Sequence, residues 1–203
     1  PNRIDYSSTN GSDIWNGIET SDNGRYSLYV GGGEELTAAV RIYNRYGARL
    51  YDNLLIFKSN ELYMLEGDSP KDFVIKTISE NIGCPAPYTL TSAEVGYEMI
   101  SGELQRNIVI WLSSSGPYIF DGSTPKPIQG IENYFDKTSN DYFGIDNIKD
   151  SFAWYDPDYA EWNLRIVDQW FVYDFLRRRW YSKDVGNGEL PQAAFQVTDT
   201  DGS

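Results

Sequence analysis

Three acidic side chains lie close together in the segment YDPDYAEW, at residues 155–162. Asp156, Asp158 and Glu161 carry the carboxylate oxygens that a hard cation such as calcium prefers as ligands. Their spacing matches no calcium-loop template, and Pro157 suits a simple turn. We therefore expect a structural turn at this position and predict no metal site.

Arg177, Arg178 and Arg179 form the only basic run of the chain. Such a run could contact nucleic acid or an acidic neighbouring subunit. The alternative is a solvent-exposed hairpin tip followed by a packed Trp180. These three arginines are the only interaction residues that the sequence singles out.

Other features that could support catalysis are incomplete. The Gly-rich segment VGGGEE (30–35) lacks the Lys-Ser/Thr pair that completes a phosphate-binding loop, so a strand-to-strand turn is expected there. The chain contains no histidine, which excludes Ser–His–Asp and Cys–His hydrolases and histidine-containing zinc sites. Cys84 is expected to be a buried structural thiol. With 30 acidic residues, no particular carboxylate pair stands out as a glycosidase pair. We predict no catalytic residue, no cofactor and no enzyme activity.

The composition indicates a folded, acidic protein. Of its 203 residues, 40 % are apolar and 15 % are aromatic, which is enough to form a sizeable core. The formal net charge of −13 argues against a general nucleic-acid binder, because such proteins need clustered cations. No segment has the roughly 18–20 consecutive apolar residues that a membrane span requires. A single cysteine rules out a disulfide within the chain.

Eight short segments predict β-strands, because they are rich in β-branched and aromatic residues and are separated by Gly, Pro, Asn, Asp and Ser clusters. They are RYSLYV (25–30), NLLIF (53–57), ELYML (61–65), FVIKTI (73–78), NIVIWL (107–112), PYIF (117–120), WNLRIV (162–167) and WFVYDF (170–175). The best helix candidate, IQGIENYFD (128–136), contains Gly130 and is limited to a few turns. The sequence therefore predicts an all-β, antiparallel fold.

One hairpin pattern recurs along the chain. Residues 53–67 resemble residues 107–122, with Leu54–Phe57 aligned to Ile108–Trp111 and one extra residue in the second hairpin loop. A fainter third copy covers residues 163–175. Aromatic residues recur 55 and 53 residues apart, at Tyr63, Tyr118 and Phe171. An acidic residue suited to accept backbone hydrogen bonds in a turn closes each copy; these residues are Glu66, Asp121 and Asp174.

Repeats of this length with several strands each are typical of β-propeller blades. We expect blades of about 54 residues within one domain covering residues 1–203, with approximate repeats at 1–50, 51–105, 106–160 and 161–203. Complete propellers usually have about four to eight blades. The sequence therefore predicts a partial propeller that belongs to a longer protein.

The order of these motifs resembles a family of tailed-bacteriophage virion proteins with propeller-like folds, found in tail nozzles, tail hubs and related assemblies. The resemblance covers Asn2 to Trp180. Besides the two hairpins, it depends on NRIDYSS (2–8), GGGEELTAAVRIYN (31–44), ENIGCPAPYTL (80–90), IQGIENYF (128–135), SFAWYDPDYAEWNLRI (151–166) and VYDFLRRRW (172–180). The last of these also resembles the strand–turn–Trp pattern of kelch-type blades.

The resemblance implies a structural role in the virion tail or head–tail connector, with synthesis in the host cytoplasm. The expected partners are identical subunits in a ring and other tail proteins, with DNA passing through the ring without specific binding. The acidity agrees with a wall that does not hold DNA, although solubility alone also accounts for it. Two alternatives stay open. One is a carbohydrate-binding or glycan-processing propeller, and the other is a kelch-like protein-interaction module.

Overall fold

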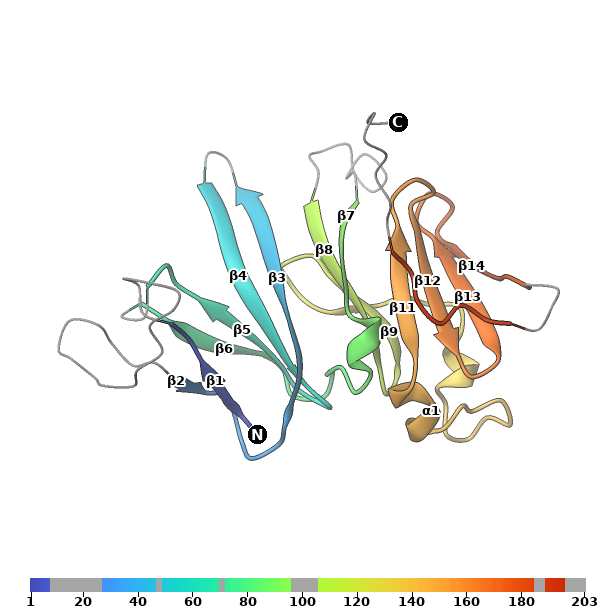
Figure 1. Cartoon of the computed structure of the whole chain (residues 1–203), viewed down its shortest axis with the longest axis horizontal. Coiled ribbons are helices and arrows are strands. Elements are labelled where there is room, and N and C mark those ends of the chain that lie inside the picture. The colour runs from blue at the N-terminus through green and yellow to red at the C-terminus, as the bar shows by residue number, and fades with distance from the viewer. Residues whose placement is uncertain (8–26, 47–48, 70–71, 96–105, 185–188, 196–203) are drawn as a thin grey trace.

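Three four-stranded antiparallel sheets make up most of the chain (Figure 1). The structure is a computed structural model that describes residues 1–7, 27–46, 49–69, 72–95, 106–184 and 189–195. The first sheet contains β3 (Leu36–Tyr46), β4 (Arg49–Lys58), β5 (Leu62–Glu66) and β6 (Val74–Ser79). The second contains β7 (Thr91–Val95), β8 (Arg106–Ser113), β9 (Gly116–Phe120) and β10 (Lys126–Pro127). The third contains β11 (Phe152–Asp156), β12 (Glu161–Ile166), β13 (Gln169–Asp174) and β14 (Arg179–Ser182).

The remaining elements are short. β1 (Arg3–Asp5) and β2 (Ser27–Tyr29) pair as a two-stranded sheet. The helical elements in the described ranges are the single-turn 3-10 helices η1 (Pro87–Thr89) and η3 (Glu132–Tyr134) and the α-helix α1 (Ile145–Lys149). The helix expected over residues 128–136 is therefore one 3-10 turn, because Gly130 adopts a positive φ of 124° that a helix cannot accommodate. Each of the eight predicted strand segments overlaps a strand, so the all-β antiparallel prediction is confirmed.

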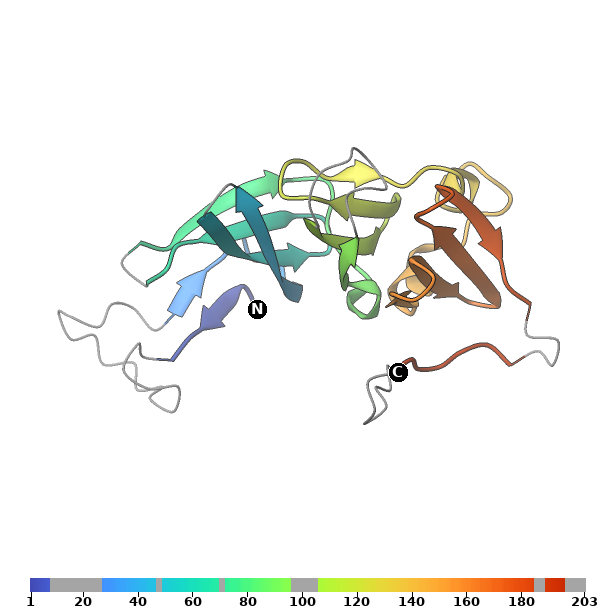
Figure 2. The same ribbon diagram turned by 90° about the horizontal axis from the view of Figure 1, so that it is seen from above.

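Each large sheet is a simple meander in which consecutive strands pair. The three sheets stand side by side along an arc, with their first strands on its inner side and their last strands on its outer side (Figure 2). The first strands of neighbouring sheets contact one another, β3 with β7 and β7 with β11. Blade-like sheets arranged around a common axis have this order of strands.

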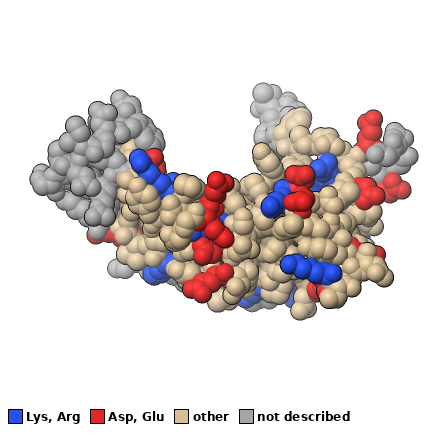
Figure 3. Space-filling model, turned by 90° about the horizontal axis from the view of Figure 1, so that it is seen from below, with Lys and Arg blue, Asp and Glu red and all other residues tan. Residues whose placement is uncertain are grey.

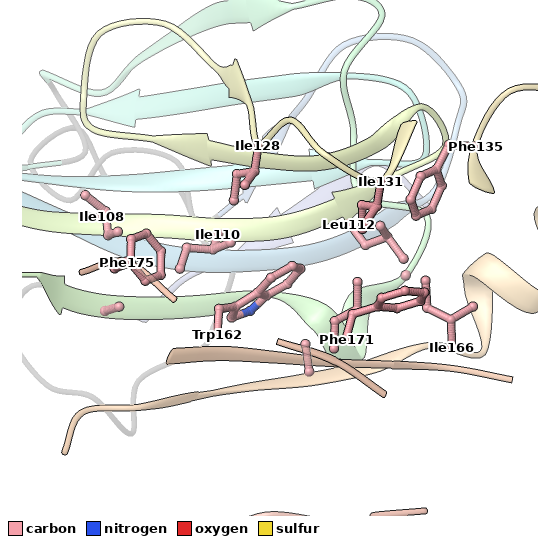
Figure 4. Packing of buried hydrophobic residues seen from close by; sticks show 14 of the residues in the cluster. Ile108, Ile110, Leu112, Ile128, Ile131, Phe135, Trp162, Ile166, Phe171 and Phe175 are labelled. Carbon is pink, nitrogen blue, oxygen red and sulfur yellow. The ribbon is translucent and has the colours of Figure 1, made fainter. Parts of the chain in front are cut away.

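The sheets pack face to face through two separate apolar layers. Between the first and second sheets, Phe57 and Trp111 meet edge to face, with ring centroids 5.1 Å apart. Between the second and third sheets, Ile110 and Leu112 of β8 lie against Trp162 and Phe171 (Figure 4). β8 is therefore buried on both faces, which explains its continuous apolar run. Full burial of each large side chain contributes roughly 1.5–3 kcal/mol to stability.

The repeated hairpins are equivalent in register. Their second and third strands pair Ile56 with Tyr63, Trp111 with Tyr118, and Leu164 with Phe171. Each pair encloses the same number of residues, so the extra residue predicted in the second hairpin loop is absent. Ile56 in the first hairpin is therefore equivalent to Trp111 in the second, whereas the sequence alignment matched Ile56 to Ile110. The alignment of this strand shifts by one residue. Apolar side chains on both faces of these strands hid this shift, because a one-residue slip keeps the pattern apolar.

The recurring aromatic residue packs on the preceding sheet in all three copies. Tyr63 faces β1 and β2, Tyr118 faces the first sheet, and Phe171 faces the second sheet. The predicted repeats begin near the second strand of each sheet, whereas the sheets themselves begin at Leu36, Thr91 and Phe152. The repeat that is visible in the sequence is thus the central hairpin of each sheet, and it does not mark where the sheet begins.

Candidate functional site

The three arginines lie at the turn between β13 and β14, and all three are exposed. Arg177 is held in this turn, because its guanidinium lies 2.6 Å from the Asp174 carboxylate and its backbone N–H donates to the same carboxylate at 2.8 Å. The following Trp180 packs against Phe171 and Tyr173. The run is therefore an exposed hairpin tip with a packed tryptophan after it.

Two of the three acidic residues that close the repeated hairpins, Asp121 and Asp174, accept hydrogen bonds from backbone N–H groups as expected. Asp121 accepts from the backbone N–H and the hydroxyl of Ser123. Burial alone would raise the pKa of Asp174, but the hydrogen bonds and charge of Arg177 outweigh it and lower the pKa. Glu66 instead forms an ion pair with Lys76 on the neighbouring strand.

The segment YDPDYAEW is a second copy of the same turn. Tyr155, Asp156 and Trp162 have the spacing of Tyr173, Asp174 and Trp180, and both turns end in a residue with positive φ, Ala160 and Arg178. Asp156 accepts a 3.0 Å hydrogen bond from the backbone N–H of Asp158 and a 3.4 Å one from that of Tyr159. The second bond is equivalent to the one that Asp174 accepts from Arg177. Within the described part of the chain, no group of three or more His, Cys, Asp or Glu residues is placed to hold a metal.

The other two sequence features have structural roles. The loop at residues 31–35 joins β2 to β3, and the Lys58 ammonium donates a 3.0 Å hydrogen bond to the Gly32 carbonyl oxygen. Glu61 forms an ion pair with this buried lysine at 2.9 Å. Cys84 is fully buried, and burial raises the pKa of its thiol to about 12. Its protonated thiol donates to the Ala86 carbonyl oxygen at 3.3 Å.

The third sheet has a polar and aromatic face on the side away from the second sheet, and we call it the outer face. Cross-strand pairing places Trp154, Asn163, Val172 and Tyr181 on this side. Phe152 stacks on Trp154 with ring centroids 5.4 Å apart, and Trp154 lies 5.6 Å from Trp170. Three aromatic rings therefore form a continuous row.

Charged groups lie beside this row. Lys183 lies 2.8 Å from the Glu161 carboxylate and 5.4 Å from the centre of the Trp170 ring. Tyr181 donates its hydroxyl hydrogen to Glu161, and both burial and this hydrogen bond raise the pKa of Tyr181. The Trp170 indole donates a 3.0 Å hydrogen bond to Asn163.

Residues 189–195 cross the outer face as an extended strap. Gln192 accepts a hydrogen bond from Arg165 at 3.3 Å, while Nε of Arg165 is buried without a hydrogen-bond partner. An open pocket of about 300 Å³ lies between the strap residues Ala194 and Phe195 and the segment Trp154–Asp158. The strap therefore covers the outer face incompletely.

The sequence contained a signal for this face that the prediction missed. In EWNLRI (161–166), polar and apolar residues alternate, whereas the equivalent strands NLLIF and NIVIWL are apolar at every position after their first asparagine. Alternation indicates a strand with only one face in an apolar core.

Charges of both signs are interspersed on the side of the molecule in Figure 3, where the coloured atoms form no continuous basic surface. No helix among the described residues is long and apolar enough to cross a membrane. Comparison of the chain with protein-family models and with curated protein sequences finds no match.

Proposed function

We propose that this protein is a non-enzymatic structural component of a tailed-bacteriophage virion, acting as a ring subunit of the tail or head–tail connector. The supporting observation is the face-to-face stacking of three four-stranded meanders with their first strands on the inner side of an arc. Such an arrangement suits a partial propeller. Its rigid sheets hold subunits around a DNA conduit, and its partners are identical subunits and other tail proteins.

Charge and motif order provide further support. A net charge of −13 disfavours retention of DNA phosphates, which lets DNA pass without binding. The order of motifs from Asn2 to Trp180 resembles that of propeller-like phage tail proteins. The protein accordingly acts in the virion tail after synthesis in the host cytoplasm.

The test is the native mass of the protein at micromolar concentration, followed by electron microscopy of any assembly. A closed ring of several identical subunits with a central channel is expected. A monomer at every concentration would contradict the proposal and favour a kelch-like interaction module.

A second candidate is carbohydrate binding, favoured by the Phe152–Trp154–Trp170 row and the open pocket beside it. Aromatic rings next to carboxylates suit the apolar faces and hydroxyl groups of sugars. This candidate predicts saturable quenching of tryptophan fluorescence by a glycan, and the loss of that quenching in Trp154→Ala. If no glycan on an array binds the protein, carbohydrate binding is excluded as a candidate function.

A further inference from the structure

Strands β3 and β4 continue beyond the rest of the first sheet as a two-stranded arm (Figure 1). β4 pairs with β5 only from Leu54 to Phe57, whereas its pairing with β3 reaches Arg49. We call residues 42–46 and 49–53 the arm. On the side away from β3, the β4 part of the arm pairs with no strand among the described residues. A strand edge of this kind presents backbone N–H and C=O groups to a partner.

The arm is basic and aromatic. It carries Arg45 and Arg49 together with three tyrosines and one acidic residue, Asp52. Arg41, at the base of the arm, pairs with Asp52 through a 2.6 Å contact between Nε and Oδ1. The charges of Arg45 and Arg49 are therefore not balanced by any acidic residue of the arm. Tyr and Arg, with Trp, are the residue types that contribute most to binding at protein interfaces.

The charge of the whole chain favours a protein partner for the arm over a nucleic acid. The chain has a net charge of −13 although the arm itself is positive, so the remainder is more acidic still. Such a body repels the phosphates of a nucleic acid and attracts a basic segment of another molecule. A second copy of this chain supplies the acidic surface that the arm requires.

Exposed carboxylates lie at the end of the sheets opposite to the arm, around α1 (Figure 1). Residues 131–150, which include η3 and α1, contain five acidic residues and two lysines. All five acidic residues are exposed, and none forms an ion pair with a Lys or Arg of the described residues. They are Glu132, Asp136, Asp141, Asp146 and Asp150.

Exposed apolar side chains lie beside these carboxylates. Tyr88 in η1 is 74 % exposed, and Ile145 in α1 is 40 % exposed. η1, drawn in green, and α1 lie side by side in both ribbon views (Figures 1 and 2). We call η1 together with residues 131–150 the acidic end. Its combination of apolar and charged groups is typical of a protein interface.

Two of the carboxylates are placed to meet a pair of cations. Asp146 lies in the first turn of α1, and Asp150 is the C-cap of the same helix, four residues later. Residues four apart on a helix are neighbours, and like charges in this arrangement repel each other. A basic partner relieves this repulsion.

We propose that the arm of one copy binds the acidic end of a second copy, with the two unbalanced arginines against the carboxylates of Asp146 and Asp150. The arm and the acidic end lie at opposite ends of one chain, so the contact joins two copies head to tail (Figure 1). A head-to-tail contact closes a ring when the rotation between successive copies returns to the first copy. This inference rests on the proposed function, because it specifies which surfaces join the subunits of the ring.

The experiment measures the native mass of the full chain at low salt by light scattering after size-exclusion chromatography. The arm variant, Arg45→Glu with Arg49→Glu, reverses the charge of the arm. The end variant, Asp146→Lys with Asp150→Lys, reverses the charge of the acidic end. Circular dichroism and thermal melting check that each variant is folded.

The matched control is Arg178→Glu with Arg179→Glu. It reverses two exposed arginines in the turn between β13 and β14, outside both surfaces. The control therefore changes the net charge of the chain as much as the arm variant does. It also tests whether the arginine turn joins the subunits instead.

Each of the two variants alone is expected to run at the monomer mass of 23.2 kDa at concentrations where the wild type and the control assemble. In a 1:1 mixture, the reversed arm meets the reversed acidic end, and the unchanged arm meets the unchanged acidic end. Both contacts then join opposite charges, so the mixture is expected to assemble like the wild type. This rescue is specific to the two surfaces. Added salt should weaken the assembly, because it screens exposed charges.

Three results would overturn the inference. If both variants still assemble, or if their mixture stays monomeric, other surfaces join the subunits, and the proposed ring function stands without this interface. If the control is monomeric and the arm variant assembles, the arginine turn is the contact. If the wild type is a monomer at all concentrations, the ring function fails together with the interface. Binding of labelled single-stranded DNA by that monomer, lost in the arm variant, would assign the arm to nucleic acid.

Discussion

The indole Nε1 of Trp111 donates a 2.9 Å hydrogen bond to the carbonyl oxygen of Gly83. Trp111 lies in the second sheet, and Gly83 lies in the connection that leaves the first sheet. The bond and the contact of Trp111 with Phe57 thus join two sheets whose backbones form separate ladders.

Replacing Trp111 by Phe should destabilise the fold by about 2 kcal/mol, because it leaves a buried carbonyl oxygen without its donor and opens a gap in the apolar layer. Urea unfolding measures the change. Trp154→Phe, at a half-buried position, is the control and should cost clearly less. Equal losses for the two variants would contradict this account.

Gly31→Ala should also destabilise the protein, by about 2 kcal/mol. Gly31 has a φ of +55°, and an added Cβ would lie 2.1 Å from the hydroxyl oxygen of Tyr63. The control is Gly33→Ala, where an added Cβ meets nothing within 4 Å. Thermal unfolding should separate the two variants, and the prediction fails if their midpoints coincide.

Val167→Asn should stabilise the protein by about 1 kcal/mol. Val167 is a β-branched residue with a φ of +53° in the turn between β12 and β13, a conformation that asparagine tolerates better. The same substitution at Val74, an exposed strand position, should instead destabilise, because asparagine disfavours strands. Denaturant titration of both variants measures the free energy of unfolding, which should rise in Val167→Asn and fall in Val74→Asn.

The hydrogen bonds of Asp174 predict a specific loss of stability in acid. The folded-state pKa of Asp174 lies below its ordinary value of 3.8, so its contribution is complete well above pH 3.8. That contribution disappears as the pH falls through the folded-state pKa. Asp174→Asn should therefore be less stable than the wild type at pH 7, with the difference shrinking below pH 3.8. A difference that stays constant down to pH 2 would contradict the assignment.

The Cys84 thiol should resist thiol reagents in the folded protein. Burial raises its pKa to about 12, so little thiolate forms at pH 8. Reaction with a disulfide reagent at pH 8 should be slow until denaturant is added, and then rapid. Immediate labelling of the native chain would show that the thiol is accessible.

The central hairpins and the all-β class could be predicted because their strands carry dense apolar runs between turn residues. The first strand of each sheet was harder to predict. β3 contains Thr37, Ala38 and Ala39, and β11 is only five residues long, so neither provides a strong periodic signal. The face that each residue presents in β4 and β8 depends on register, and two-sided burial removes the alternation that would reveal register.

The arginine turn could be predicted, but the outer-face cluster of Glu161, Tyr181 and Lys183 could not. Glu161 is 20 positions from Tyr181 and 22 from Lys183 in sequence, and it meets them only because β12, β13 and β14 pair in sequence order. Their proximity results from the pairing of the strands, and no local sequence motif indicates it.

The second sheet has separate apolar layers on its two faces, one toward the first sheet and one toward the third. Tension that separates the two end sheets acts on these layers in series, so the weaker layer alone sets the breaking strength of the stack. A substitution that strengthens the other layer would leave that strength unchanged. Of the Phe57–Trp111 layer and the Ile110–Trp162 layer, the weaker one is therefore the place where a pulled stack would separate first.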